Sequence, residues 1–459
     1  MTQRTRSAEP GVSVVVPTYN RCELLGHTLD ALAAQRPGGQ DFEVIVADDG
    51  SSDATGQVAS SFADRLRLRY FFQEDQGYRV ARVRNRGARM AAAPVLVFID
   101  AGVRPGPDFV LAHLDAHRGA GSVTGAGSVT GSVAGDTSQG ARGRLVVGYT
   151  YGYNPYDPCP GLADMLARYG PADVVRAMDG TPSFRDLRHD AFAAVGFELN
   201  AMAVPWMHCW SVNLSVSAAD FWAVGGFDED FRSWGGEDLD LGYRLTRHGV
   251  PMALSRAAWA IETPHDRDLE ANNDSSFGNA MLFLAKNPEP VVELFWGIYG
   301  HGRWDPPLEY EYGQLTAWQR QARDLDVLGE LDAATRQSAA ARGRARVAVF
   351  GCGGRVPSWW ASSGSEFVLA DFDPELLDRA AGGRYRRLHA IGLRVAEPES
   401  SFDLVVITSR LAGLWHRWEA LLRDEANRIG RSLWVAPIAD DPADPRPMPA
   451  DGRLAQPSS

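Results

Sequence analysis

The first hundred residues alternate between short apolar runs and longer amphipathic stretches. The runs Val12 to Val16, Phe42 to Ala47 and Val95 to Ile99 are rich in β-branched and aromatic residues, as is typical of strands that are covered on both faces. Between the first two runs, Leu24 to Leu32 places its apolar side chains on one helical face. This alternation predicts an α/β fold with a doubly wound, mostly parallel sheet, which binds its ligands at the carboxyl ends of the strands.

Polar residues that follow the first two strands predict helix caps. Asn20, with Glu23 three residues later, is expected to cap the first helix, and Ser52 or Asp53 is expected to cap the second. A third strand is expected over Arg67 to Phe72.

Length and charge narrow the class of protein. The chain has 459 residues, whereas single domains typically have about 100 to 200, so more than one domain is expected. The net charge of -12 argues against nucleic-acid partners, which are usually bound by basic surfaces. The four cysteines lack metal-ligand spacing and fit a reducing compartment. No apolar run is long enough for a transmembrane segment, so a cytoplasmic location is expected.

Composition divides the chain into four parts. Residues 1–285 are expected to form the first domain, interrupted by a flexible insertion of small residues at 119–143. A helical linker is expected at 286–344, a small Rossmann-like domain at 345–439, and a disordered tail at 440–459.

Four stretches of the first domain carry most of its polar motifs. They are Val14 to Asn20, Val46 to Asp53, Gln73 to Asp100, and Trp234 to Asp238. In this order they resemble glycosyltransferase family 2, whose members have the GT-A fold. The third stretch resembles the subgroup of chondroitin-polymerase and galactosyltransferase domains. The resemblance implies sugar transfer, with inversion, from a nucleoside-diphosphate sugar, with a UDP-sugar favoured. The acceptor is then a small molecule, a glycan or a peptide.

The first three stretches are expected to bind the donor. A nucleotide needs a loop of short residues after the first strand and a carboxylate for its base or ribose. Guanidinium groups at the start of a helix can pair with a diphosphate. The structural alternatives are that the aspartates only form a turn with a helix cap, and that the arginines only form a solvated basic helix face. The expected donor residues are Pro17, Thr18, Tyr19, Asn20, Asp48, Asp49, Arg79, Arg84, Asn85 and Asp100.

The fourth stretch resembles the acceptor-binding and catalytic motif of the family. Inverting transfer needs a base that removes a proton from the acceptor, and a positioned carboxylate typically contributes about 10² to 10⁴ in rate. Asp238 is the expected base, and Glu237 is expected to orient the acceptor. Trp234, followed by Gly235 and Gly236, offers a sugar ring an apolar platform. Alternatively, the two acids simply complement the dipole of the helix that follows.

The end of the fourth strand departs from the family pattern. Family members carry Asp-x-Asp here, and the second carboxylate binds a divalent cation, whereas this chain has Asp100-Ala101-Gly102. Losing one oxygen ligand weakens a site for Mn²⁺ or Mg²⁺. By the resemblance, Asp100 and His265 remain candidate metal ligands, with Asp266 in a supporting role.

The C-terminal part resembles a truncated class I methyltransferase. Val347 to Gly354 is glycine-rich, and Asp371 ends the next apolar run, as in folds that bind a cofactor's ribose there. The part spans only about 95 residues, which favours a structural or regulatory role without S-adenosylmethionine. Two alternatives remain open: a bifunctional protein that also methylates, and an inactive GT-A protein that binds nucleotide or carbohydrate.

Overall fold

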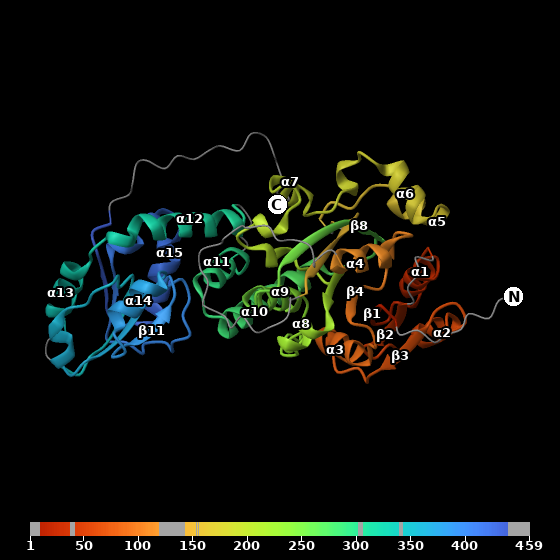
Figure 1. Ribbon diagram of the computed structural model, residues 1–459. Helices are drawn as coiled ribbons and strands as arrows, with labels where there is room; N and C mark the ends of the chain where they lie inside the picture. Colours follow the sequence, from red (N-terminus) through yellow and green to blue (C-terminus); the bar gives the residue numbers. More distant parts are fainter. Residues whose placement is uncertain are drawn as a thin grey trace. The chain divides into compact units, whose positions relative to one another are not determined.

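The computed structural model describes residues 10–36, 42–118, 143–152, 154, 156–301, 306–338 and 343–438. The chain forms two compact units, Met1–Phe283 and Leu284–Ser459 (Figure 1). The tail predicted at 440–459 and, apart from its last residue, the insertion predicted at 119–143 lie outside the described residues.

The first unit is built on an eight-stranded sheet of order β3-β2-β1-β4-β7-β6-β8-β5. Strands β3, β2, β1 and β4 are parallel, β7 runs antiparallel to both of its neighbours, β6 is parallel to β8, and β5 is antiparallel to β8. The predicted mostly parallel α/β sheet is confirmed. The strands are β1 (Val12–Thr18), β2 (Phe42–Asp48), β3 (Leu68–Phe72), β4 (Val95–Ile99), β5 (Val103–Pro105), β6 (Leu145–Tyr151), β7 (Asn213–Ser217) and β8 (Met252–Glu262).

Helices cover both faces of the parallel part of this sheet. On one face, α1 (Cys22–Ala33) buries Leu25 and Leu29 in a core that also contains Val14 and Val46. On the other face, α3 (Val80–Met90) approaches so closely at Gly87 that a Cβ atom there would lie 2.6 Å from Val15. Alternate residues of β1 therefore serve the two layers, which is why the strand is apolar throughout.

Further helices complete the first unit. They are α2 (Thr55–Ser61), α4 (Phe109–Arg118), α5 (Leu162–Arg168), α6 (Pro171–Met178), α7 (His189–Ala194), α8 (Ala218–Ala223), α9 (Glu237–Arg247) and α10 (Leu269–Lys286), which continues to the start of the second unit.

The predicted cap of the first helix is wrong, whereas that of the second is confirmed in part. Asp53 accepts a hydrogen bond from the amide of Thr55, the first residue of α2, at 3.0 Å, although Ala54 takes the N-cap position. Helix α1 starts after Arg21 without a side-chain cap, because Asn20 has a left-handed backbone (φ 49°) rather than the extended one of a cap. The Asn20 side-chain oxygen instead accepts a hydrogen bond from the Ser52 amide at 2.8 Å. In return, the Asp53 carboxylate accepts one from the Cys22 amide at 3.0 Å, so the loop after β2 caps α1.

The second unit is built on a five-stranded parallel sheet of order β11-β10-β9-β12-β13. This is the predicted second, smaller α/β domain. Its strands are β9 (Arg346–Phe350), β10 (Glu366–Asp371), β11 (Arg386–His389), β12 (Leu404–Ile407) and β13 (Leu433–Val435). Its helices are α11 (Pro290–Tyr299), α12 (Leu308–Gln321), α13 (Leu328–Arg336), α14 (Pro374–Ala381) and α15 (Ala412–Ile429).

Buried carboxylates hold the loops of the second unit. Glu293 on α11 is 1% exposed and accepts hydrogen bonds from the backbone amides of Ile391, Gly392 and Arg394. Burial raises the pKa of Glu293 to about 8, although the amides oppose this shift. In the part of the chain that the structure describes, no helix is sufficiently long and apolar to span a bilayer.

Candidate active site

The carboxyl ends of β1, β2 and β4 bring the first predicted residues to one edge of the sheet, because these strands are parallel neighbours. Pro17 and Thr18 are buried at the end of β1, and the Thr18 carbonyl accepts a hydrogen bond from the Asp49 amide at 2.9 Å. The Thr18 hydroxyl has no hydrogen-bond partner within the described residues.

Asp48 and Asp49 have different surroundings. Asp48 is fully buried, and its carboxylate accepts hydrogen bonds from the amides of Gly50 and Ser51 and from the Tyr70 hydroxyl. It therefore closes the turn after β2. Asp49 accepts hydrogen bonds from the Gln73 side chain at 2.5 Å and from the Arg79 amide at 2.9 Å. Burial raises the pKa of Asp49, against the effect of these donors.

The loop after β3 contributes Gln73, Asp75 and Tyr78, which lie in the third predicted stretch but are not among the expected donor residues. Tyr19 donates its hydroxyl to Asp75 at 2.8 Å, and Gln73 binds Asp49. The pKa of Tyr78 is raised well above its usual range by burial and by the charges of nearby Glu237 and Asp100. Gln73, Asp75 and Tyr78 lie in the polar stretch that directly follows the parallel strand β3, which is the signal that could have identified them.

Arg84 links two parts of the site that are far apart in sequence. Its guanidinium donates to Asp100 at 2.9 Å and to Glu237 at 2.7 Å, and Arg84 itself is only 3% exposed. We predicted Arg84 to pair with the donor diphosphate. In the structure it instead joins the end of β4 to the start of α9.

Asn85, also predicted to bind the donor, holds a loop. Its side-chain amide donates to the Phe227 carbonyl at 2.8 Å and to Glu229 at 3.0 Å, and its oxygen accepts from the Phe227 amide at 2.9 Å. The side chain is buried. Asn85 therefore fixes the loop that leads to the Trp234 to Asp238 motif.

That motif forms the N-terminus of α9. Gly236, with φ 96°, precedes the helix in a left-handed conformation that residues with a Cβ atom rarely adopt. The Asn279 amide binds the carbonyls of Trp234 and Gly235 at 3.0 and 2.5 Å. The loop thus leaves Trp234 39% exposed, while Glu237 is 4% exposed. Within the described residues, the Glu237 Oε2 atom has no hydrogen-bond partner.

Asp238 is half-buried beside Glu237. Its carboxylate accepts hydrogen bonds from the Ser211 amide at 3.2 Å and from the Leu239 amide at 2.8 Å. The pKa of Asp238 is raised, first by burial and then by the charge of Glu237, while Arg84 acts in the opposite direction. A carboxylate with a raised pKa and a buried neighbour is suited to accept a proton near neutral pH.

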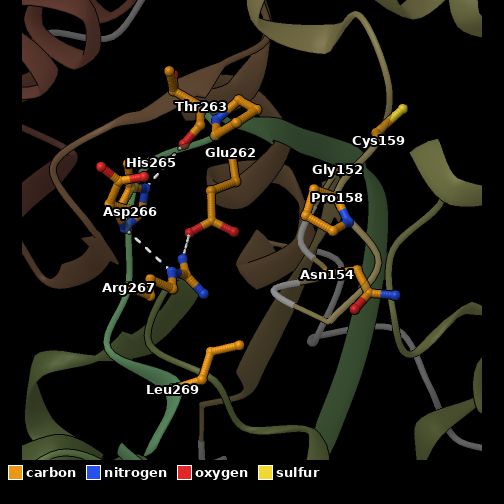
Figure 2. A pocket seen from close by; sticks show the side chains of 11 residues that line it. Gly152, Asn154, Pro158, Cys159, Glu262, Thr263, His265, Asp266, Arg267 and Leu269 are labelled. Carbon is orange, nitrogen blue, oxygen red and sulfur yellow. Dashed lines mark hydrogen bonds and ion pairs between the residues drawn. The ribbon is translucent and has the colours of Figure 1, made fainter. Parts of the chain in front are cut away.

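The end of β8 lines a cavity of about 180 Å³ (Figure 2). Figure 2 shows Glu262 and His265 pointing toward Arg267, and both contact it. Burial raises the pKa of Glu262 to about 8, although Arg267 lowers it. Burial also lowers the pKa of His265. Its Nδ1 atom donates to the Thr263 carbonyl at 3.0 Å, which leaves Nε2 as an acceptor.

The residues at this edge do not fit a divalent cation. The His265 Nε2 atom faces the guanidinium groups of Arg21 at 2.7 Å and Arg267 at 3.2 Å, and exposed Asp266 lies at the cavity wall. At Gly102 (φ 101°), a Cβ atom would point at Leu24 on α1, 3.4 Å away. Across the described ranges, no three His, Cys, Asp or Glu side chains form a group that could hold a metal ion.

At the carboxyl ends of the strands in the second unit, the predicted cofactor-binding aspartate is buried and paired within the protein. Asp371 is fully buried at the end of β10, where it accepts hydrogen bonds from Gly353, Asp373 and Arg410. The Arg410 guanidinium is fully buried as well, 2.7 Å from the Asp371 carboxylate. The acidic residue that we predicted from the cofactor pattern is therefore fully engaged within the protein.

Comparison with known proteins agrees with this arrangement. Residues 13–154 match the family described as Glycosyl transferase family 2, and residues 193–265 match the N-terminal domain of galactosyltransferase. Validoxylamine A glucosyltransferase of Streptomyces hygroscopicus subsp. limoneus is 42% identical over 94% of this chain and 91% of its own length. Chondroitin synthase of Escherichia coli is 29% identical over 54% of this chain and 34% of its own length.

Among solved structures, S. aureus TarS aligns with a TM-score of 0.41 and 15% identity, covering 70% of this chain and 48% of its own. The two matched families span the donor edge and the α9 motif, and the relative from Streptomyces extends over both units. This chain belongs to glycosyltransferase family 2, and it is a glycosyltransferase.

Proposed function

We propose that the protein transfers a glucosyl residue, with inversion, from a nucleoside-diphosphate glucose to validoxylamine A or a similar small molecule. The donor class follows from the polar edge of the sheet, and a UDP-sugar is favoured. The sugar and the acceptor class follow from the relative that is 42% identical, which is described as a validoxylamine A glucosyltransferase.

The observation that carries the proposal is the bridge made by Arg84. It fixes Asp100, at the donor edge, and Glu237, beside Asp238, within 2.9 Å of one guanidinium. A donor at the end of β4 and an acceptor at the start of α9 would then meet between these groups. Holding two reactants in this way removes much of the entropic cost of their encounter.

Asp238 is the proposed general base. It takes the proton from an acceptor hydroxyl as that oxygen attacks the anomeric carbon. The bond from this carbon to the diphosphate oxygen breaks, and the nucleoside diphosphate leaves with the bonding electrons. Attack from the face opposite the leaving group inverts the configuration.

Glu237 and Trp234 are proposed to position the acceptor. The buried Glu237 Oε2 atom, which has no hydrogen-bond partner among the described residues, can accept a hydrogen bond from an acceptor hydroxyl. Such a bond offsets the cost of burying a carboxylate oxygen. The exposed face of Trp234 can stack against the apolar face of an acceptor ring.

The test uses the full chain with UDP-glucose and validoxylamine A. Asp238→Asn should lower kcat/KM by about 10² to 10⁴ and leave UDP binding intact, because the amide cannot accept the proton. Asp230→Asn, an exposed acid in the same segment, is the matched control and should be close to wild type. Glu237→Gln should raise KM for the acceptor. NMR of the product reports the anomeric configuration.

Unchanged turnover in Asp238→Asn would remove this residue from the role of base. Retention of configuration would exclude the single-displacement route. Failure of every nucleoside-diphosphate sugar to react or bind would overturn the proposed function itself.

A further inference from the structure

Two arginines from distant segments meet beside the donor edge. Arg21 directly precedes α1, next to Asn20, and Arg267 follows β8. Both guanidinium groups approach the same imidazole nitrogen, His265 Nε2, at 2.7 and 3.2 Å. A neutral imidazole is an unusual meeting point for two cations, because it carries no charge of its own; of the two, Arg267 is also paired with Glu262.

The surrounding strands place this pair next to the end of β4. Val103 on β5 pairs with Glu262 on β8, and the Gly102 carbonyl accepts a hydrogen bond from the Thr263 amide at 3.0 Å. The residues that carry the arginine pair therefore adjoin the turn Asp100-Ala101-Gly102. The family pattern expects a metal-binding carboxylate in this turn.

The backbone gives a reason why no carboxylate stands at position 102. The residue has φ 101°, and its Cβ direction leads to the Leu24 side chain of α1. An aspartate there would be strained and would direct its carboxylate into the apolar contact with α1. With this second carboxylate absent, nearby arginines are an alternative source of positive charge at this edge.

We propose that Arg21 and Arg267, held together by His265, bind the donor diphosphate and replace the divalent cation at this site. This inference rests on the proposed function. A guanidinium carries a permanent charge and can donate two parallel hydrogen bonds to phosphate oxygens. Arg84 is buried between two carboxylates, Asp100 and Glu237, whereas Arg267 is paired with one, Glu262, and Arg21 is exposed.

The chemistry of the reaction gives the pair its role. The diphosphate gains negative charge as its bond to the sugar breaks, and preorganised donors stabilise that charge. His265 fixes the two guanidiniums at one spot before the donor arrives. Arg267 is further anchored by Glu262, while Arg21 is exposed at the loop after β1.

The experiment is calorimetric titration of the EDTA-treated full chain with UDP and with uridine, each repeated with added Mn²⁺. Wild type should bind UDP equally well, within about twofold, with and without Mn²⁺. Arg21→Gln and Arg267→Gln should each weaken UDP binding by about tenfold or more, as expected for losing a charged hydrogen bond, and leave uridine binding unchanged. Thermal unfolding verifies that the variants are folded.

Arg36→Gln is the matched control, because Arg36 lies beyond the other end of α1 in an exposed pair with Asp108. It should bind UDP like wild type. A tenfold gain in UDP affinity on adding Mn²⁺, or unaltered UDP binding in both site variants, would overturn the inference while leaving the proposed function standing. If neither UDP, dTDP, GDP nor ADP binds with or without Mn²⁺, the proposed function fails and the inference with it.

Discussion

The two units use the same device, an aspartate at the end of a parallel strand paired with an arginine, with opposite outcomes. In the first unit, Arg84 is shared between Asp100 and Glu237, and the Asp100 side chain remains 40% exposed. In the second unit, both Arg410 and Asp371 are fully buried. A strand that ends in aspartate therefore does not by itself identify a ligand site. The position of its partner decides whether the carboxylate faces solvent.

The largest expected effect is on stability, when the buried pair of Arg410 and Asp371 is broken. Arg410→Met leaves the buried Asp371 without its cation, which should lower the free energy of unfolding of the second unit by about 3–5 kcal/mol. Chemical denaturation measures this loss. Arg387→Met, which removes an exposed pair with Asp378, should cost about 1 kcal/mol or less. Equal losses in the two variants would contradict the expected difference between the buried and the exposed pair.

Disturbing the bridge that Arg84 makes between Asp100 and Glu237 should lower activity. Arg84→Lys keeps the charge, but a single ammonium cannot reproduce the forked contacts to Asp100 and Glu237. Because a lost charged hydrogen bond is worth about 1.5–3 kcal/mol, kcat/KM should fall by about tenfold to a hundredfold. Arg86→Lys, an exposed position on α3, serves as the control. Wild-type kcat/KM in Arg84→Lys would show that the bridge is not needed for transfer.

The activity of the site in the first unit should also depend on pH through Asp238. Burial and the charge of Glu237 raise the pKa of Asp238, and the base acts only when deprotonated. Activity should therefore be full at alkaline pH and fall as the pH drops through this raised pKa, above the ordinary aspartate value of about 3.9. A profile of kcat/KM against pH gives the pKa at which activity falls on the acidic side. If this pKa is at or below the ordinary aspartate value, Asp238 is not the base.

The last prediction is that S-adenosylmethionine has no effect on stability. S-adenosylmethionine should not raise the unfolding temperature of the full chain, because the Asp371 carboxylate is already satisfied by Gly353, Asp373 and Arg410. A bound ligand raises stability in proportion to the logarithm of its concentration over Kd. A saturable increase would reopen the methyltransferase alternative.

The fold was largely predictable because hydrophobic periodicity reports the layers of a sheet. Val95–Ile99 was predicted residue for residue, since both of its faces are buried. The antiparallel direction of β7 between β4 and β6 was outside that reasoning, which considered only β-α alternation. Caps were less predictable, because Asn20 binds the loop after β2 in place of its adjacent helix, whereas Asp53 binds the start of α1 in addition to its own helix, α2.

The site was predictable in its location and less so in its contacts. Asp100 and Glu237 were each expected near the reacting groups, but no local pattern indicates that Arg84, which lies 153 residues before Glu237, joins them. The same holds for Arg21 and His265, which are 244 residues apart. Spacing in a sequence reports the periodicity of an element, whereas pairing between segments depends on the order of the strands.

The crosswise exchange between Asn20 and Asp53 constrains how this enzyme can be altered. Each side chain stabilises the loop that carries the other, so a substitution at one position exposes unsatisfied amides at the other. A chimaera that takes one of these loops from a relative is therefore expected to fold well only if it takes the other loop as well. Homologues should carry both Asn20 and Asp53 or neither of them.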